Sequence, residues 1–185
     1  YEVKLMGDDN KLSKLDEVKL SDNGNFLIYY TKKGHNAITD VDAGRIASIL
    51  EQSVDTCKSK FGFDYKYNAY FEFFSVAMTE CPTGTAKGRA CKLLKNNNID
   101  TKYLNTAMPV YIIDTGDDNV LGYYFPYVND IQQIIVKVST IFKDYGEAME
   151  QVAATYSFPY FVVNSNISNL DNTNIVSAHE LFHQS

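Results

Sequence analysis

The sequence contains no tryptophan, only four prolines and three cysteines, and no long apolar run. No segment approaches the roughly 20 consecutive apolar residues of a transmembrane helix, so we expect no membrane span. Basic residues are few: 17 Lys and Arg stand against 23 Asp and Glu, which gives a net charge of −6. Because binding to phosphates needs clustered Lys and Arg, an acidic chain without a basic stripe argues against a nucleic-acid partner.

What is present is an ordinary globular composition. The chain has 185 residues, of which 45% are hydrophobic and 22% charged. This excludes a disordered tail, a collagen-like fibre and a coiled coil, and it is enough chain for one domain with its own core. We therefore expect a single domain over 1–185, in which 1–24 form a polar N-terminal extension and 25–185 form the body of the domain.

The three cysteines, Cys57, Cys81 and Cys91, cannot all pair within one chain. Two alternatives stay open, because Cys81 and Cys91 can form a small bridge or all three can be free. Their spacing matches neither a zinc ribbon nor a C-x-x-C redox pair.

Hydrophobic periodicity predicts the first half of the secondary structure. Phe26–Thr31 is an apolar run between turn residues and predicts a strand. Apolar residues then recur at helical spacing from Asp42 to Lys60, with Asp42 itself a suitable N-cap. Tyr67–Ala77 is aromatic and β-branched, which predicts a strand, and Thr85–Lys95 predicts a short helix.

Hydrophobic patterns and turn residues also predict the second half of the secondary structure. Val110–Asp114 and Val120–Phe125 flank a turn sequence and predict a hairpin. Ile131–Phe142 and Asp144–Tyr156 predict helices. Phe158–Asn164 predicts a strand that begins at a sheet edge, since a proline near its start cannot donate to a ladder. The fold class expected is therefore α+β, with a mixed sheet and packed helices.

The most specific signal is H-E-x-x-H at residues 179–183. Positions i and i+4 of a helix lie on one face, so His179 and His183 can reach one metal ion. Glu180 lies about 100° round the helix from His179, a position that suits a general base better than a ligand. Good N-cap residues at 171–174 precede this stretch, which predicts that it is helical.

Two imidazoles favour zinc, which keeps a position open for water in catalytic sites and lowers the pKa of that water towards ~7. Glu180 would then take the proton as the water attacks a peptide carbonyl. The third ligand is not in the motif. The one other histidine, His35, is in a loop segment, where a lone histidine is more often idle. We expect the third ligand beyond Ser185, and hence a domain that is incomplete at its C-terminus.

The segment around the motif resembles the active-site helix of zincin metallopeptidases, in particular a group of secreted bacterial enzymes. Five segments carry the resemblance: Ser177–Gln184, Asn25–Thr31 with the following Asp40–Asp42, Pro109–Asp114, Leu121–Tyr123 and Tyr160–Asn164. The resemblance implies a zincin-like N-terminal subdomain that ends in the H-E-x-x-H helix, and an extracellular or cell-surface zinc endopeptidase. The Asp-rich loop is shorter than the group's calcium-loop-like version, so an N-cap role is expected for Asp40 and Asp42.

Two further interpretations stay open. The first is a catalytically inactive or truncated peptidase-like domain that acts as a protein-interaction module. The second is a structural metal site, or no metal at all. Glu180 argues against the structural site, because structural zinc sites are usually closed by four protein ligands without a neighbouring base. If the chain is a peptidase, its partner is a peptide or protein substrate, and Phe158–Asn164 is the strand expected to pair with it by strand addition.

Overall fold

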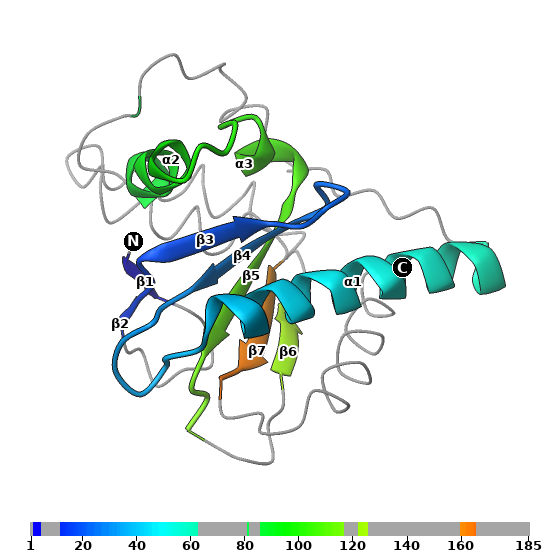
Figure 1. The fold of residues 1–185 in the computed structure, drawn as a ribbon, viewed down its shortest axis with the longest axis horizontal. Coiled ribbons are helices and arrows are strands. Elements are labelled where there is room, and N and C mark those ends of the chain that lie inside the picture. The colour runs from blue at the N-terminus through cyan, green and yellow to red at the C-terminus, as the bar shows by residue number, and fades with distance from the viewer. Residues whose placement is uncertain are drawn as a thin grey trace, which may run out of the picture.

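A five-stranded mixed sheet forms the centre of the fold in a computed structural model, which describes residues 2–4, 12–62, 81, 86–116, 122–125 and 160–165 (Figure 1). The strand order is β3-β4-β5-β7-β6. The strands are β3 (Glu17–Leu20), β4 (Phe26–Tyr30), β5 (Met108–Ile113), β6 (Gly122–Phe125) and β7 (Tyr160–Asn164). The inner strands β4, β5 and β7 are parallel, and the outer strands β3 and β6 run antiparallel to their neighbours.

Three helices and a small second sheet complete the described part. The helices are α1 (Asp40–Phe61), α2 (Ala86–Asn96) and α3 (Tyr103–Thr106). The second sheet pairs β1 (Glu2–Lys4) with β2 (Leu12–Lys14). Among the described residues, no helix is both long enough and apolar enough to cross a membrane.

Apolar side chains on both faces of the sheet are buried, which explains why the sequences of the inner strands are almost continuously hydrophobic. Side chains alternate between the faces along each strand. On β4, Phe26 and Ile28 pack with Leu50 of α1, whereas Leu27 packs on the opposite face with Leu94 of α2. The sheet is therefore sandwiched between α1 on one side and α2 with α3 on the other.

Helix α1 begins two residues before the predicted start. Its N-cap is Thr39, whose hydroxyl accepts a hydrogen bond from the Asp42 backbone N–H at 3.1 Å. Asp42 is the third residue of the helix and its carboxylate completes a capping box with Thr39. The prediction of Asp42 as N-cap was thus wrong by three residues, because a capping box places a second polar residue at the third helical position, where Asp42 lies. The helix ends at Gly62, where φ is +74°.

The predicted hairpin is wrong. β5 and β6 do not pair with each other, because β7 lies between them and is parallel to β5 and antiparallel to β6. The prediction that the last strand begins at an edge is wrong for the same reason. Tyr160 already pairs with Phe125 of β6, and Phe161 pairs with Val110 of β5.

Other expected elements are confirmed or lie outside the described residues. The strand predicted at Phe26–Thr31 is β4, and the helix predicted at Thr85–Lys95 is α2. The segments Tyr67–Ala77, Ile131–Phe142 and Asp144–Tyr156 lie outside the described residues. The mixed sheet with packed helices is as expected. The stretch 1–24 supplies β1, β2 and the sheet strand β3.

Candidate functional site

The residues of the H-E-x-x-H motif, His179, Glu180 and His183, lie outside the described residues. The last described residues before them are those of β7 and Ser165, which follows it. What the structure describes is therefore the framework from which the chain runs towards the motif. This framework comprises the carboxyl ends of the parallel strands, the outer strand β6 and the turns around them.

Hydrogen bonds fix the end of β7 against the end of β5. The backbone N–H of Ser165 donates to the carbonyl of Ile113 at 2.8 Å. The side-chain amide of Asn164, which is 3% exposed, donates to the Thr115 hydroxyl at 2.8 Å. Buried polar side chains are generally hydrogen-bonded, and this contact holds the end of β7 against the turn that follows β5.

The loop between β4 and α1 lies against the same end of β5. The buried Asn36 accepts a hydrogen bond from the backbone N–H of Asp114 through its side-chain oxygen, at 2.6 Å. Asp114 in turn accepts from the N–H of Gly116 at 2.8 Å, which shapes the turn after β5. The carboxyl ends of β4, β5 and β7 therefore form one polar edge, held by side-chain to backbone hydrogen bonds.

His35 lies in this β4–α1 loop and is exposed. The structure does not bring it together with other ligand types: among the described residues, no three His, Cys, Asp or Glu side chains are grouped so that they could hold a metal ion.

The Asp-rich start of α1 is engaged in contacts of its own. Asp40 accepts a hydrogen bond from the Tyr30 hydroxyl at 2.6 Å and pairs with the Lys32 ammonium at 3.0 Å. The hydrogen bond from Tyr30, followed by that from Lys32, holds the pKa of Asp40 below its usual value. Burial, followed by the bond to Asp40, raises the pKa of Tyr30. A lysine ammonium already neutralises Asp40, and Asp42 belongs to the capping box, so these residues serve the helix start.

The outer strands β3 and β6, rather than Phe158–Asn164, are the strands of this sheet that can pair with an extended peptide. Both sides of β7 are occupied, by β5 and by β6, so β7 cannot accept a further strand. Within the described residues, β3 and β6 each pair on one side only. Strand addition needs unpaired backbone groups, and these are found on outer strands.

The buried carboxylate of Glu51 was missed at the sequence level. Glu51 is 6% exposed on the inner side of α1 and accepts from the Asn25 amide at 2.7 Å, from the Asn23 amide at 3.3 Å and from the Ser21 hydroxyl. It thereby ties the β3–β4 turn to the helix. A signal existed in the sequence, since Glu51 falls between Leu50 and Val54, both on the apolar face of the helix.

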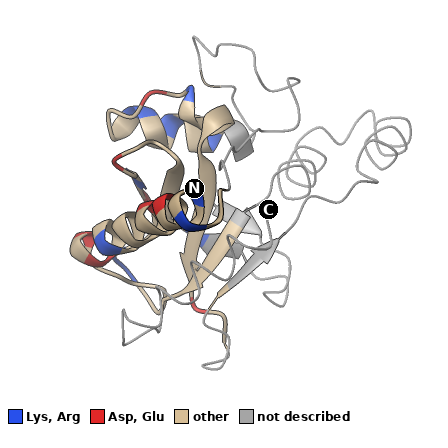
Figure 2. Cartoon of the chain, turned by 90° about the vertical axis from the view of Figure 1, so that its right-hand side faces the viewer, with Lys and Arg blue, Asp and Glu red and all other residues tan. Residues whose placement is uncertain are grey.

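Positive charge is unevenly distributed, which corrects the expectation that the chain has no basic stripe. Lys and Arg residues gather on α2, as Figure 2 shows. Arg89, Lys92 and Lys95 are spaced three residues apart, and this helical spacing brings them to one side of α2. The sequence pattern was overlooked because the whole-chain balance is acidic.

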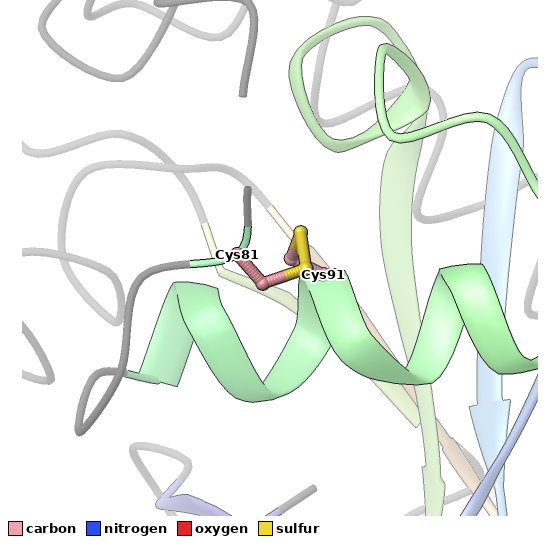
Figure 3. The surroundings of a disulfide bond; sticks show 2 residues. All are labelled: Cys81 and Cys91. Carbon is pink, nitrogen blue, oxygen red and sulfur yellow. A yellow bond between two sulfur atoms is a disulfide. The ribbon is translucent and has the colours of Figure 1, made fainter. Parts of the chain in front are cut away.

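The cysteine alternatives are decided in favour of the bridge. Cys81 and Cys91 form a disulfide, which ties residue 81 to the middle of α2 (Figure 3). Cys91 is fully buried, and Cys57 is a free, buried cysteine on α1. The disulfide and the core contacts of Leu94 therefore both anchor α2 through its buried side.

Comparison of the chain with protein-family models, with curated proteins and with solved structures gives no match in any of the three. The resemblance to zincin metallopeptidases therefore depends on the residues quoted above, chiefly on the H-E-x-x-H motif.

Proposed function

We propose that the protein is a zinc-dependent metallopeptidase that hydrolyses peptide bonds. The observation that carries the proposal is the motif itself, in which two of the three histidines of the chain stand four residues apart around Glu180. Two imidazole nitrogens are a donor set that fits zinc, and a neighbouring carboxylate is what a hydrolytic site requires and a structural site does not.

His179 and His183 would hold the ion, together with a ligand still to be identified. Bound zinc supplies a Lewis acid that polarises the scissile carbonyl and acidifies the attacking water. Glu180 takes the proton from that water and returns it to the leaving amine, so one carboxylate acts first as base and then as acid.

The described framework supports this proposal in three ways. β7, which precedes the motif in the sequence, is held on both sides by β5 and β6 and at its end by Asn164. β6 offers an outer edge that suits an extended peptide, which is the conformation in which a backbone can add to a sheet. The Cys81–Cys91 disulfide favours an oxidising compartment, in line with an extracellular or cell-surface location.

The test combines zinc content with cleavage of an unfolded protein substrate such as casein. It is performed on this chain and on a form that continues past Ser185. Glu180→Gln is expected to keep the zinc of the unsubstituted protein and to lose at least about 100-fold in cleavage rate, because general acid–base catalysis supplies a factor of that size. Glu17→Gln, which alters a half-exposed glutamate on β3, is the matched control and should cleave normally.

If Glu180→Gln cleaves as fast as the unsubstituted protein, the assigned mechanism is wrong. If neither form binds zinc in excess metal, the protein is not a zinc peptidase. The interaction-module interpretation then takes its place.

A further inference from the structure

A second surface, on the opposite side of the sheet from α1, carries positive charge. Residues 86–102 contain five basic residues and one acidic residue, Asp100, and so have a formal net charge of +4. Since the whole chain has −6, the remaining residues carry −10. The basic residues of this stretch are Lys87, Arg89, Lys92, Lys95 and Lys102. Figure 2 shows several blue segments on this side of the molecule, and others on α1.

The charges project from a helix that is firmly held. Ala90, Cys91 and Leu94 are each at most 4% exposed on the inner side of α2, whereas Lys92 and Lys95 are exposed. Side chains three residues apart on a helix have Cβ atoms about 5–6 Å apart. Lys102, in the turn before α3, has a side chain that is 63% exposed, and its ammonium forms an exposed ion pair with Asp100 at 3.5 Å, which a partner carboxylate would replace. We call Lys92, Lys95 and Lys102 the α2 basic surface.

Residues 86–102 have a positive net charge, whereas the whole chain has a negative one. Because salt screens charges from one another, a ligand at α2 is influenced mainly by the charges close to it. At physiological ionic strength the Debye length is about 8 Å, so an anionic group at α2 responds mainly to the lysines beside it. α2 has 11 residues and spans about 16 Å, which accommodates a short anionic segment. A nucleic acid, with a dense row of phosphates extending well beyond this length, would also meet the repulsion of the acidic remainder.

We propose that the α2 basic surface is an interaction site for an acidic segment of a polypeptide. An extended peptide places every second side chain on one side, about 6.6–6.8 Å apart, close to the spacing of lysines on successive turns of α2. Carboxylates along such a segment can pair with Lys92, Lys95 and Lys102. Because exposed ion pairs are individually weak, binding depends on several pairs forming together and weakens with salt.

The test uses a fluorescently labelled decaglutamate peptide and measures its anisotropy against the whole chain at low and at physiological salt. Lys92→Glu/Lys95→Glu is expected to weaken binding at low salt by about tenfold or more, since two attractive contacts become repulsive. Lys58→Glu/Lys60→Glu is the matched control. It changes the net charge equally at two exposed lysines in the last turn of α1 and should change the affinity by less than about twofold.

Three results would overturn the proposal. The first is equal weakening in both variants, which would mean that net charge alone attracts the peptide. The second is no binding of decaglutamate by the unsubstituted chain at low salt. The third is tighter binding of a single-stranded oligonucleotide with the same number of charges, which would identify a nucleic acid as the partner class. Urea unfolding of both variants confirms that each is folded.

Discussion

Glu51→Ala is expected to lower the free energy of unfolding by about 3 kcal/mol. The alanine variant loses the two closest contacts of the carboxylate, with the Ser21 hydroxyl and with the Asn25 amide, and leaves the buried Ser21 hydroxyl without its acceptor. Hydrogen bonds to a charged group contribute about 1.5–3 kcal/mol each. We take the lower end of the sum, because water can enter the space left by the side chain. A loss of this size is a large share of the roughly 5–15 kcal/mol that keeps a domain folded.

The assay is equilibrium urea unfolding, in which the midpoint should fall while the slope with denaturant stays unchanged. Glu51→Gln keeps one acceptor oxygen and should lose about half as much as the alanine variant. Asp55→Ala, at an exposed position of the same helix, is the control and should change stability by no more than about 0.5 kcal/mol. A loss below about 1 kcal/mol for Glu51→Ala would show that the β3–β4 turn is held without this carboxylate, and the reasoning would be refuted.

Three further predictions concern stability. Replacing Cys81 by serine and Cys91 by alanine removes the cross-link across a sequence separation of 10 and should cost about 2.5–3 kcal/mol by loop entropy, seen as a lower thermal midpoint. Gly24→Ala should destabilise by at least about 1–2 kcal/mol in urea, because φ is +75° there and a Cβ would meet the ring of the first tyrosine of α3 at 2.9 Å. The hydrogen bond from the Thr31 hydroxyl lowers the pKa of Asp16, so it stabilises the fold above about pH 4, and this stabilisation is lost as the pH falls through the folded-state pKa. In Thr31→Val, the free energy of unfolding should therefore fall less steeply below about pH 4 than in the unsubstituted protein.

Local structure could be predicted where the signal is itself local. The apolar run of β4 and the helical spacing of α1 and α2 give the element types directly, because burial of a continuous strand or of one helix face leaves that pattern in the sequence. The start of α1 was misplaced by two residues, since Thr39 and Asp42 are both suitable N-caps and only the backbone shows which one is outside the helix.

Long-range pairing could not be predicted. A turn sequence between β5 and β6 is compatible with a hairpin, and nothing near it in the sequence reveals that β7 comes between them. The prediction that β7 begins at a sheet edge was wrong for a related reason. It relied on Pro159, but the described pairing of β7 begins at the next residue, Tyr160. For the candidate site, the ligand types and their spacing come from the sequence. Which strands have an edge open to a peptide, β3 and β6, follows only from the strand order.

The position of β7 has a consequence for how the chain reaches its folded state. β5 and β6 are synthesised before β7. Within the described sheet, however, β7 is the pairing partner of β6 and one of the two pairing partners of β5. Until residues 160–164 have emerged from the ribosome, β5 presents an unpaired parallel edge made almost wholly of apolar residues. Such edges favour association between nascent chains. Insertion of β7 removes this edge, and because non-local parallel pairing is slow, substitutions that slow it further should reduce the yield of soluble protein more than they reduce the stability of the finished molecule.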